Sequence, residues 1–314
     1  MPFAYAADAR TPRRWLAFLD QLWGDDNQPK QTLAEIIGYL ISGDTSQQKA
    51  FLFVGPKRSG KGTIARVIGG LVGVHNVVGV TSNQLAGNFG LAQLVGKPVA
   101  IMSDARIRSD QSLLTERLLA VSGEDVLTAD RKYRDPWTGK FPTRFVVLSN
   151  ELPRLVDTSG ALASRFVVLM FTRSFYGAED TELTGKLHAE LPGILNWALA
   201  GLDRLRASGR FIMPDASADA VRELVDLGSP VGAFVRDRCQ IGPGKTVACD
   251  QLYQAWRTWC DDFGRVHPGT AQTFGRDLRA AVPGLKVTQP REDGGRQRRH
   301  YEGITLATAA HNGQ

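Results

Sequence analysis

Short apolar runs alternate with segments of helical spacing between Gln47 and about Phe171. The runs lie at 51–54, 77–80, 99–103, 144–148 and 166–171. Runs of this length without internal polar positions are typical of strands that are buried on both faces. Since Ser112–Ser122 and the stretch from Ile64 to Val72 have helical spacing between such strands, we expect an α/β fold with a parallel-type sheet covered by helices.

The pattern differs on either side of this region. Residues 1–45 carry two apolar stripes of helical spacing, separated by a polar stretch at 24–29. The segment around 208–214 is the best candidate for a domain boundary, because beyond it helical stripes are followed by apolar runs at 285–288 and 300–306 around a glycine turn. We therefore predict a helical N-terminal segment (1–45), an α/β domain (46–212) and a smaller C-terminal domain (213–314).

A glycine-rich loop joins the run at 51–54 to the helix that starts near Ile64. It fits the pattern G-x-x-x-x-G-K, in which backbone N–H groups and the positive end of the helix dipole surround a phosphate. A chance turn is the alternative, but strand, loop and helix follow in the order that a phosphate site requires. We expect ATP to be held by Gly55, Pro56, Lys57, Arg58, Ser59, Gly60, Lys61, Gly62 and Thr63.

One position departs from the usual pattern. The residue after the lysine ordinarily offers a hydroxyl to Mg²⁺, but here it is Gly62. Asp104 follows the apolar run at 99–103 and is the acid expected on the magnesium side, although it could simply cap the next turn. The candidate metal ligands are Asp104 and Thr63, and we expect the Thr63 hydroxyl to contact an inner phosphate instead.

Three further features carry chemical groups. Asn150 ends an apolar strand, where an amide can orient water or sense the γ-phosphate. Arg165 precedes the last strand and either pairs with a carboxylate or reaches a neighbouring subunit's ATP as an arginine finger. The basic and aromatic cluster at 130–134 forms either an exposed hairpin or a charged surface turn.

The order of these features resembles the superfamily 3 helicases of the AAA+ class, and most of all the helicase region of phage and plasmid primase–helicases. The resemblance covers roughly residues 5–305 and implies catalytic roles for Lys61, Asp104, Asn150 and Arg165. It also implies a homo-hexameric ring whose central channel binds single-stranded DNA. The hairpin residues that would line that channel are Lys132, Tyr133 and Arg134.

The C-terminal domain resembles a winged helix that binds duplex DNA. Gln272, Arg276 and Arg279 share one polar face of a predicted recognition helix, and Arg296 and Arg298 would lie on the wing. Between Gly264 and Glu302 there are eight Arg or Lys and four Asp or Glu, so much of the chain's net charge of +6 lies here. A small structural domain with a solvated basic face is the alternative.

These features predict an ATP-driven, Mg²⁺-dependent DNA helicase of a phage, prophage or plasmid-like element, which works with a separate primase. The rivals are a DNA-binding initiator or repressor that uses ATP only to assemble, and a small-molecule (nucleotide) kinase. The 314 residues hold no run long enough for a membrane span and no signal peptide, and their three cysteines lack metal-ligand spacing. We therefore expect a cytoplasmic protein that makes no membrane contact.

Overall fold

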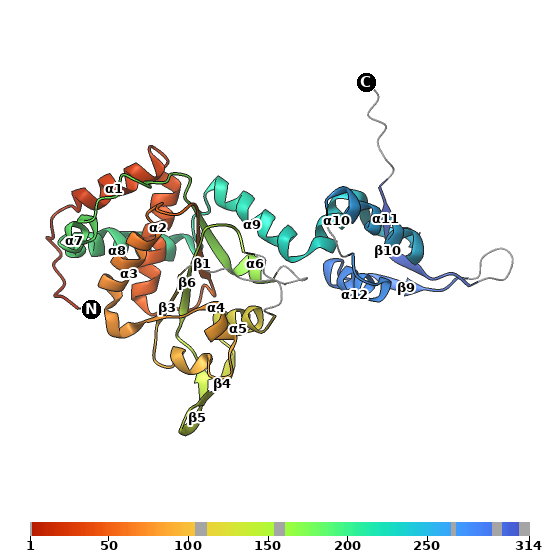
Figure 1. Ribbon diagram of the computed structural model, residues 1–314, viewed down its shortest axis with the longest axis horizontal. Coiled ribbons are helices and arrows are strands. Elements are labelled where there is room, and N and C mark those ends of the chain that lie inside the picture. Colours follow the sequence, from red (N-terminus) through yellow and green to blue (C-terminus); the bar gives the residue numbers. More distant parts are fainter. Residues whose placement is uncertain (1, 104–111, 154–160, 265–267, 291–296, 308–314) are drawn as a thin grey trace. The chain divides into compact units, whose positions relative to one another are not determined.

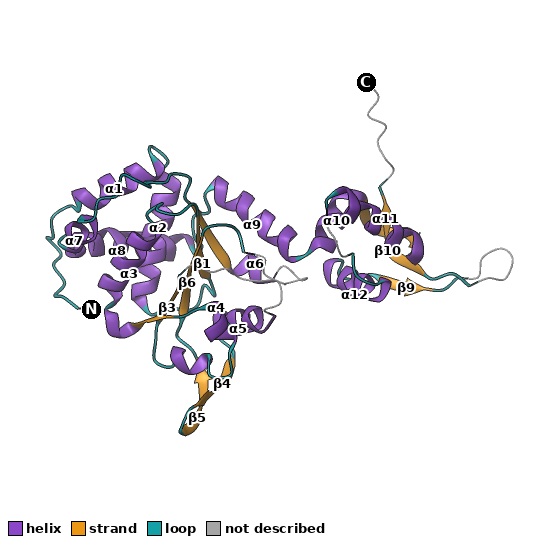
Figure 2. Ribbon diagram, in the orientation of Figure 1, coloured by secondary structure: helices purple, strands orange, loops and turns teal. Residues whose placement is uncertain are grey.

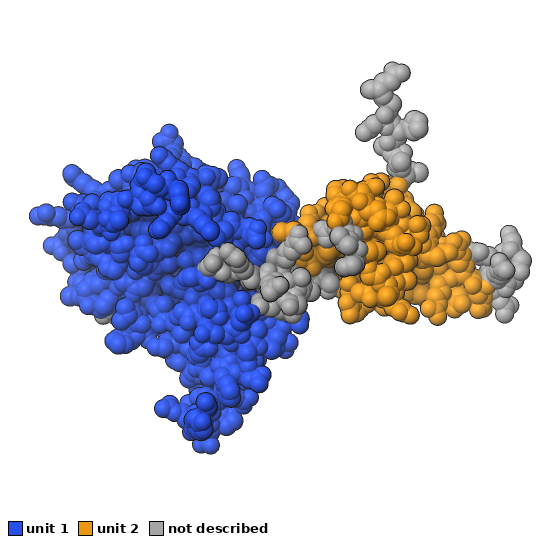
Figure 3. Space-filling model, in the orientation of Figure 1, with its two compact units in different colours: residues 1–155, 161–224 blue, residues 156–160, 225–314 orange. Residues whose placement is uncertain are grey.

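The computed structural model describes residues 2–103, 112–153, 161–264, 268–290 and 297–307. The chain forms two compact units (Figure 3). The first contains the described residues up to Pro153 together with Ala161–Leu224, and the second contains those from Val225 onward. Helix α9 (Asp215–Gly228) contains the boundary between the two units.

A five-stranded sheet in the order β2-β3-β6-β1-β7 organises the first unit (Figures 1 and 2). Every neighbouring pair in it is parallel, which confirms the α/β prediction. Its strands are β1 (Ala50–Val54), β2 (Val77–Gly79), β3 (Val99–Met102), β6 (Arg144–Ser149) and β7 (Phe166–Met170). Because the strands are parallel, their carboxyl ends share one edge of the sheet and their amino ends share the other.

Helices and short helical turns precede, connect and follow these strands. They are α1 (Arg13–Trp23), α2 (Asn27–Ser42), α3 (Lys61–Val72), η1 (Val74–Asn76), α4 (Ser82–Ala86), η2 (Leu91–Leu94), α5 (Ser112–Ser122), α6 (Ala161–Arg165), α7 (Leu183–His188) and α8 (Leu191–Ser208). One core cluster combines Trp15 of α1, Leu33 of α2, Phe51 of β1, Ile68 of α3 and Ile194 of α8. The N-terminal helices therefore pack into the same core as the sheet.

Helices α2 and α8 approach each other closely because glycine lies at both contacts. A Cβ atom at Gly38 would lie 2.4 Å from the carbonyl oxygen of Ala198, and one at Gly201 would lie 2.4 Å from the carbonyl carbon of Ala34. Backbone atoms cannot give way as the end of a side chain can, so only glycine permits this helix spacing.

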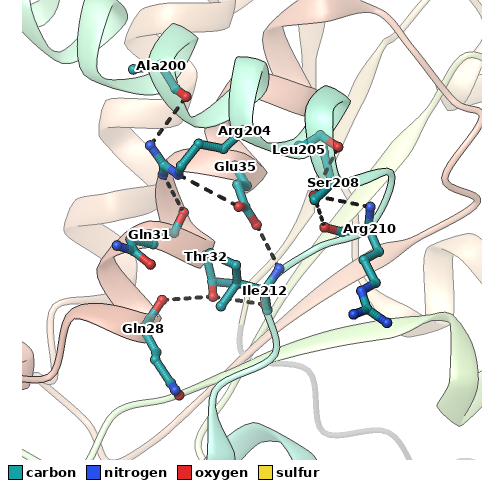
Figure 4. A network of polar contacts seen from close by, with 10 residues as sticks. All are labelled: Gln28, Gln31, Thr32, Glu35, Ala200, Arg204, Leu205, Ser208, Arg210 and Ile212. Atoms are coloured by element: carbon teal, nitrogen blue, oxygen red, sulfur yellow. Dashed lines mark hydrogen bonds and ion pairs between the residues drawn. The ribbon is translucent and has the colours of Figure 1, made fainter.

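A polar network ties the end of this helix pair to the segment that follows α8 (Figure 4). The Glu35 carboxylate is 1% exposed, accepts a hydrogen bond of 2.9 Å from the Ile212 backbone N–H, and lies 4.0 Å from Arg204 Nε. The Thr32 hydroxyl lies 3.0 Å from the Ile212 carbonyl oxygen. Both polar groups of Ile212 are thus satisfied by side chains of α2.

The cluster at 130–134 forms a hairpin. Strands β4 (Val126–Arg131) and β5 (Arg134–Lys140) pair antiparallel and form a separate two-stranded sheet. The turn consists of Lys132 and Tyr133, and Tyr133 has a φ of +59°. Of the two arrangements that the sequence left open here, the exposed hairpin is the one observed.

The second unit combines three helices with a small antiparallel sheet in the order β8-β10-β9. Its elements are α10 (Pro230–Arg238), β8 (Cys239–Ala248), α11 (Cys249–Asp262), α12 (Ala271–Ala281), β9 (Lys286–Thr288) and β10 (His300–Leu306). Phe234, Trp256 and Phe274 are packed ring against ring in its core. The glycine turn expected between β9 and β10 lies outside the described residues.

Across the described ranges of both units, no helix has the length and apolar character needed to cross a membrane.

Candidate nucleotide-binding site

The glycine-rich loop (55–63) connects the carboxyl end of β1 to α3, as the sequence predicted. A Cβ atom at Gly55 would lie 2.2 Å from the carbonyl oxygen of Phe171, so the first glycine lets the loop pass the end of β7. Gly60 has a φ of +89°, in the left-handed region that glycine adopts without strain. The backbone of the loop therefore needs glycine at both positions, at Gly55 for its close contact with Phe171 and at Gly60 for its positive φ.

Lys61 lies at the first position of α3, and its side chain folds back under the loop. Its Nζ donates to the carbonyl oxygens of Gly55 (2.5 Å) and Pro56 (2.8 Å) and lies 3.0 Å from Ser59 Oγ. The residue is 7% exposed. The ammonium group is thus held directly beneath the backbone that the sequence assigns to phosphate binding.

A hollow of about 370 Å³ opens above this loop, and we call it the phosphate hollow. It is lined by residues 57–63, Arg66, Leu148 and Asn150. Asn150 reaches it because β6 is parallel to β1 and pairs with it, so the residues after both strands meet at one edge. The structure therefore brings Asn150 to the same hollow as Lys61 and Thr63, which lie far earlier in the sequence.

The metal side of the site is only partly described. Strand β3 ends at Met102 and Ser103 is exposed, while Asp104 lies outside the described residues. Among the residues that are described, no group of three or more His, Cys, Asp or Glu side chains is placed to hold a metal ion. The fit to Mg²⁺ thus depends on Asp104, and Thr63 and Asn150 are oxygen-bearing side chains beside the phosphate hollow.

Sequence reasoning did not single out Arg66, which lies one turn after Thr63 on α3. Its Nη2 donates to Thr63 Oγ1 (3.1 Å), and its Nε donates to Thr184 Oγ1 of α7 (3.0 Å). The spacing of three residues from Thr63 places both side chains on one helix face. That spacing was visible in the sequence, but Thr184 was not an evident partner.

A second hollow of about 240 Å³ adjoins the first, and we call it the aromatic hollow. Its lining includes Phe18 and Gln21 of α1 together with Phe175 and Thr184. The segment that carries Phe175 is fastened to the loop, because Phe175 N–H donates to the Arg58 carbonyl oxygen (2.9 Å). The aromatic hollow therefore shares its wall with the glycine-rich loop.

Arg165 lies at the opposite edge of the sheet from this site. It precedes β7, whose first residue pairs with Ala50 at the amino end of β1. Its Nη1 donates to the Gln48 side-chain oxygen (2.6 Å) and lies 3.4 Å from the Ser122 carbonyl oxygen. Within one chain, therefore, the structure does not bring Arg165 to the residues that surround Lys61.

The hairpin tip carries the three predicted DNA-binding residues, and all of them are exposed. Tyr133 is 92% exposed, and Lys132 Nζ lies 5.1 Å from the centre of its ring. Arg134 begins β5 beside them, whereas the guanidinium of Arg131 donates to the Asp135 carbonyl oxygen. The tip thus presents two cations and an aromatic ring to solvent.

In the second unit, Gln272, Arg276 and Arg279 lie on the exposed face of α12, opposite the buried Phe274 and Leu278. The predicted polar face of this helix is therefore present.

Of the wing arginines, Arg298 forms a bidentate ion pair with Asp250 at 2.7 Å, and Arg296 lies outside the described residues. Hydrogen bonds from Arg298 hold the pKa of the Asp250 carboxyl below its usual range. This ion pair already engages the guanidinium that the sequence assigned to phosphate contacts.

Comparison with known proteins finds one family model that matches part of the chain and several solved structures of one similar protein region. Residues 53–165 match a family of unknown function (DUF5906). The apo structure of NrS-1 C terminal region (305-718) is 13% identical and has a TM-score of 0.61, covering 96% of this chain and 79% of that one. The A form apo structure of the same region is 12% identical with a TM-score of 0.59, covering 94% and 76%. At this identity the similarity shows a shared fold.

Proposed function

We propose that this chain is an ATP-driven DNA helicase of the AAA+ class that acts in the replication of a phage, prophage or plasmid-like element. The observation that carries the proposal is the phosphate hollow, in which the glycine-rich loop, the buried Lys61 and Asn150 converge. The position of β1 between β6 and β7 supports the AAA+ assignment. The fold similarity to the NrS-1 C terminal region covers 96% of this chain, and this supports a role in phage replication.

In the proposed reaction the loop N–H groups and Lys61 hold the phosphates of ATP. Asn150 orients the attacking water from the neighbouring strand end. Bound Mg²⁺, held by Asp104 and through water, would neutralise charge on the outer phosphates. Arg165 faces away from its own chain's site, so it serves a neighbouring subunit's ATP in a ring of six.

The hairpin couples hydrolysis to single-stranded DNA. Lys132 and Arg134 provide cations for the backbone phosphates, and Tyr133 provides a ring for packing against a sugar or base. The exposure of all three at the tip of a two-stranded projection supports this role.

We assign the second unit to duplex binding as a winged helix. The order helix, strand, helix, helix, strand, strand from α10 to β10 supports this assignment. Helix α12 would enter the major groove with Gln272, Arg276 and Arg279 facing the bases, while Arg296 and Arg298 would contact phosphates on the wing. Priming would belong to a separate primase.

ATP hydrolysis measured with and without single-stranded DNA tests the proposal. We expect DNA-stimulated hydrolysis in the wild type and its loss in Lys61→Ala, because that side chain is the cation beneath the loop. Lys97→Ala, which alters a lysine of the same unit outside the phosphate hollow, is the matched control. An unchanged rate of ATP hydrolysis in Lys61→Ala would refute the proposal that this chain is an ATP-driven helicase.

Two other outcomes of the same assay identify the rivals. ATP binding and subunit assembly without turnover would favour a DNA-binding initiator or repressor. Phosphoryl transfer from ATP to a nucleoside monophosphate would favour a nucleotide kinase.

A further inference from the structure

Arg66 lines both the phosphate hollow and the aromatic hollow. Its guanidinium is fastened at two points, Thr63 on its own helix and Thr184 on α7. In the part of the chain that is described, its Nη1 has no hydrogen-bond partner. The side chain is therefore positioned by protein contacts and still has donors available at the junction of the two hollows.

The guanidinium lies beside Gly62, the residue after Lys61. A Cβ atom at Gly62 would have one neighbour within 4 Å, namely Arg66 Nη1 at 3.6 Å. The guanidinium therefore lies next to the position where the usual pattern has a hydroxyl for the metal. It brings a permanent positive charge to a surface of α3 that Gly62 leaves open.

The same contact bears on Thr63. Its Oγ1 accepts a hydrogen bond from a cation, so a second cation at that oxygen would be repelled. The hydroxyl proton remains available to an acceptor such as a phosphate oxygen. The charge of Arg66 thus favours phosphate over Mg²⁺ as the partner of Thr63.

The second hollow has the character of a nucleoside site. Phe18 and Phe175 provide apolar rings, and Gln21 provides an amide that can donate and accept. A nucleotide whose phosphates lie in the phosphate hollow and whose base and sugar lie here would span the residues that line both hollows, and Arg66 is one of them.

We propose that Arg66 is a nucleotide-binding residue that contacts the phosphate nearest the nucleoside, with the base and sugar in the aromatic hollow. This inference rests on the proposed function, since it requires a nucleotide in the phosphate hollow. The ligand class is a nucleoside di- or triphosphate. Both classes carry the inner phosphate, so Arg66 should contribute equally to the affinity for ATP and for ADP.

Equilibrium binding of ATP and of ADP to the full chain tests the proposal. We expect Arg66→Gln to weaken both nucleotides by about tenfold or more, the usual scale for one charge-assisted hydrogen bond to phosphate. Arg66→Lys keeps the charge but loses the fork, so its affinity should be intermediate. Arg222→Gln alters an exposed arginine of α9 that lines neither hollow, and should stay within about twofold of wild type.

Thermal unfolding without nucleotide separates binding from folding. We expect Arg66→Gln and Thr184→Val to have similar midpoints, because each loses the same contact between α3 and α7. Arg66→Gln with wild-type affinity would overturn the inference, and so would an equal loss of affinity in Arg222→Gln. If the wild type binds no nucleotide at all, the proposed function fails; if only Lys61→Ala loses binding, the inference alone fails.

Discussion

At the scale of single residues, Glu35 shows how a charge is tolerated inside the first unit. Burial raises the pKa of its carboxyl, and the hydrogen bond from Ile212 N–H and the charge of Arg204 offset this only in part. Its Oε1 atom has no hydrogen-bond partner among the described residues, and Arg204 Nε is 4.0 Å away. The ionised form is thus less stable in the folded chain than in the unfolded chain.

This raised pKa gives stability a defined dependence on pH. The contribution of Glu35 to the free energy of unfolding is largest below the ordinary pKa of a glutamate, about 4.3. The contribution is lost as the pH rises through the higher folded value, because the unfolded chain ionises first. Glu35→Gln should therefore gain stability relative to wild type with rising pH, as measured by urea unfolding at a series of pH values. Glu223→Gln, on the exposed surface of α9, is the control. A constant difference between Glu35→Gln and wild type at every pH would contradict the assignment.

At this scale the sequence predicted which loop residues line the phosphate hollow, because they are consecutive in the chain. Lys61 and Thr63 follow from the loop motif, since nine consecutive residues define it. Arg66 was missed because its role depends on Thr184, which is 118 residues away, and on a hollow formed by α1. Likewise the ion pair between Arg298 and Asp250 was not evident in the sequence, because the two residues are 48 positions apart.

At the scale of elements, the crossing of α2 and α8 depends on the absence of a side chain. Gly201→Ala would place a methyl group 2.4–2.7 Å from backbone and Cβ atoms of Ala34. We expect a loss of about 1–3 kcal/mol in the free energy of unfolding, as for other overpacked cores. Gly69→Ala on α3 is the matched control, because a Cβ there meets nothing within 4 Å. It should instead stabilise by about 0.5–1 kcal/mol. Equal urea midpoints for the two variants would show that the helices separate without cost.

The hairpin offers an equally direct test of its proposed role. Tyr133 has a φ of +59° and is 92% exposed, so Tyr133→Gly should leave the turn intact. The variant loses the aromatic ring, which is worth about 1–3 kcal/mol where a base stacks on it. Basal ATP hydrolysis should remain, and stimulation by single-stranded DNA should fall several-fold. Tyr5→Ala, at another exposed tyrosine of the first unit, is the control. Full stimulation by single-stranded DNA in Tyr133→Gly would show that the ring is not part of the DNA-binding surface.

Elements with one continuous burial pattern were predicted within a residue or two. Strands β1, β3, β6 and β7 match their apolar runs because both faces of the sheet are covered. Strand β8 was missed, because Gly242-Pro243-Gly244 inside it has the composition of a turn. The structure accommodates these residues by a shift of register opposite Gly303, between Glu302 and Ile304 of β10. Long-range pairing thus overrides the local preference.

At the scale of the whole molecule, the parallel sheet separates two groups that the proposed function places in one active site. Register places Ala50 opposite Phe166 and Val54 opposite Met170, so Arg165 and the glycine-rich loop lie at opposite ends of paired strands. Five strand residues span roughly 15 Å, which is more than an arginine side chain covers. A site that contains both groups requires two copies of the chain.

This separation predicts complementation between two inactive variants. Lys61→Ala lacks the phosphate-side cation, and Arg165→Ala lacks the finger, whose loss costs about 10³–10⁵-fold in rate in other enzymes. In an equal mixture, about one quarter of the interfaces in a closed ring would pair an intact loop with an intact finger. The mixture should therefore hydrolyse ATP faster than either variant alone. Mixing Lys61→Ala with the double variant Lys61→Ala/Arg165→Ala provides the control, because no interface in it is intact. If the first mixture is no faster than this control, or if a monomer is fully active, Arg165 acts only within its own chain, where Gln48 and Ser122 already hold it.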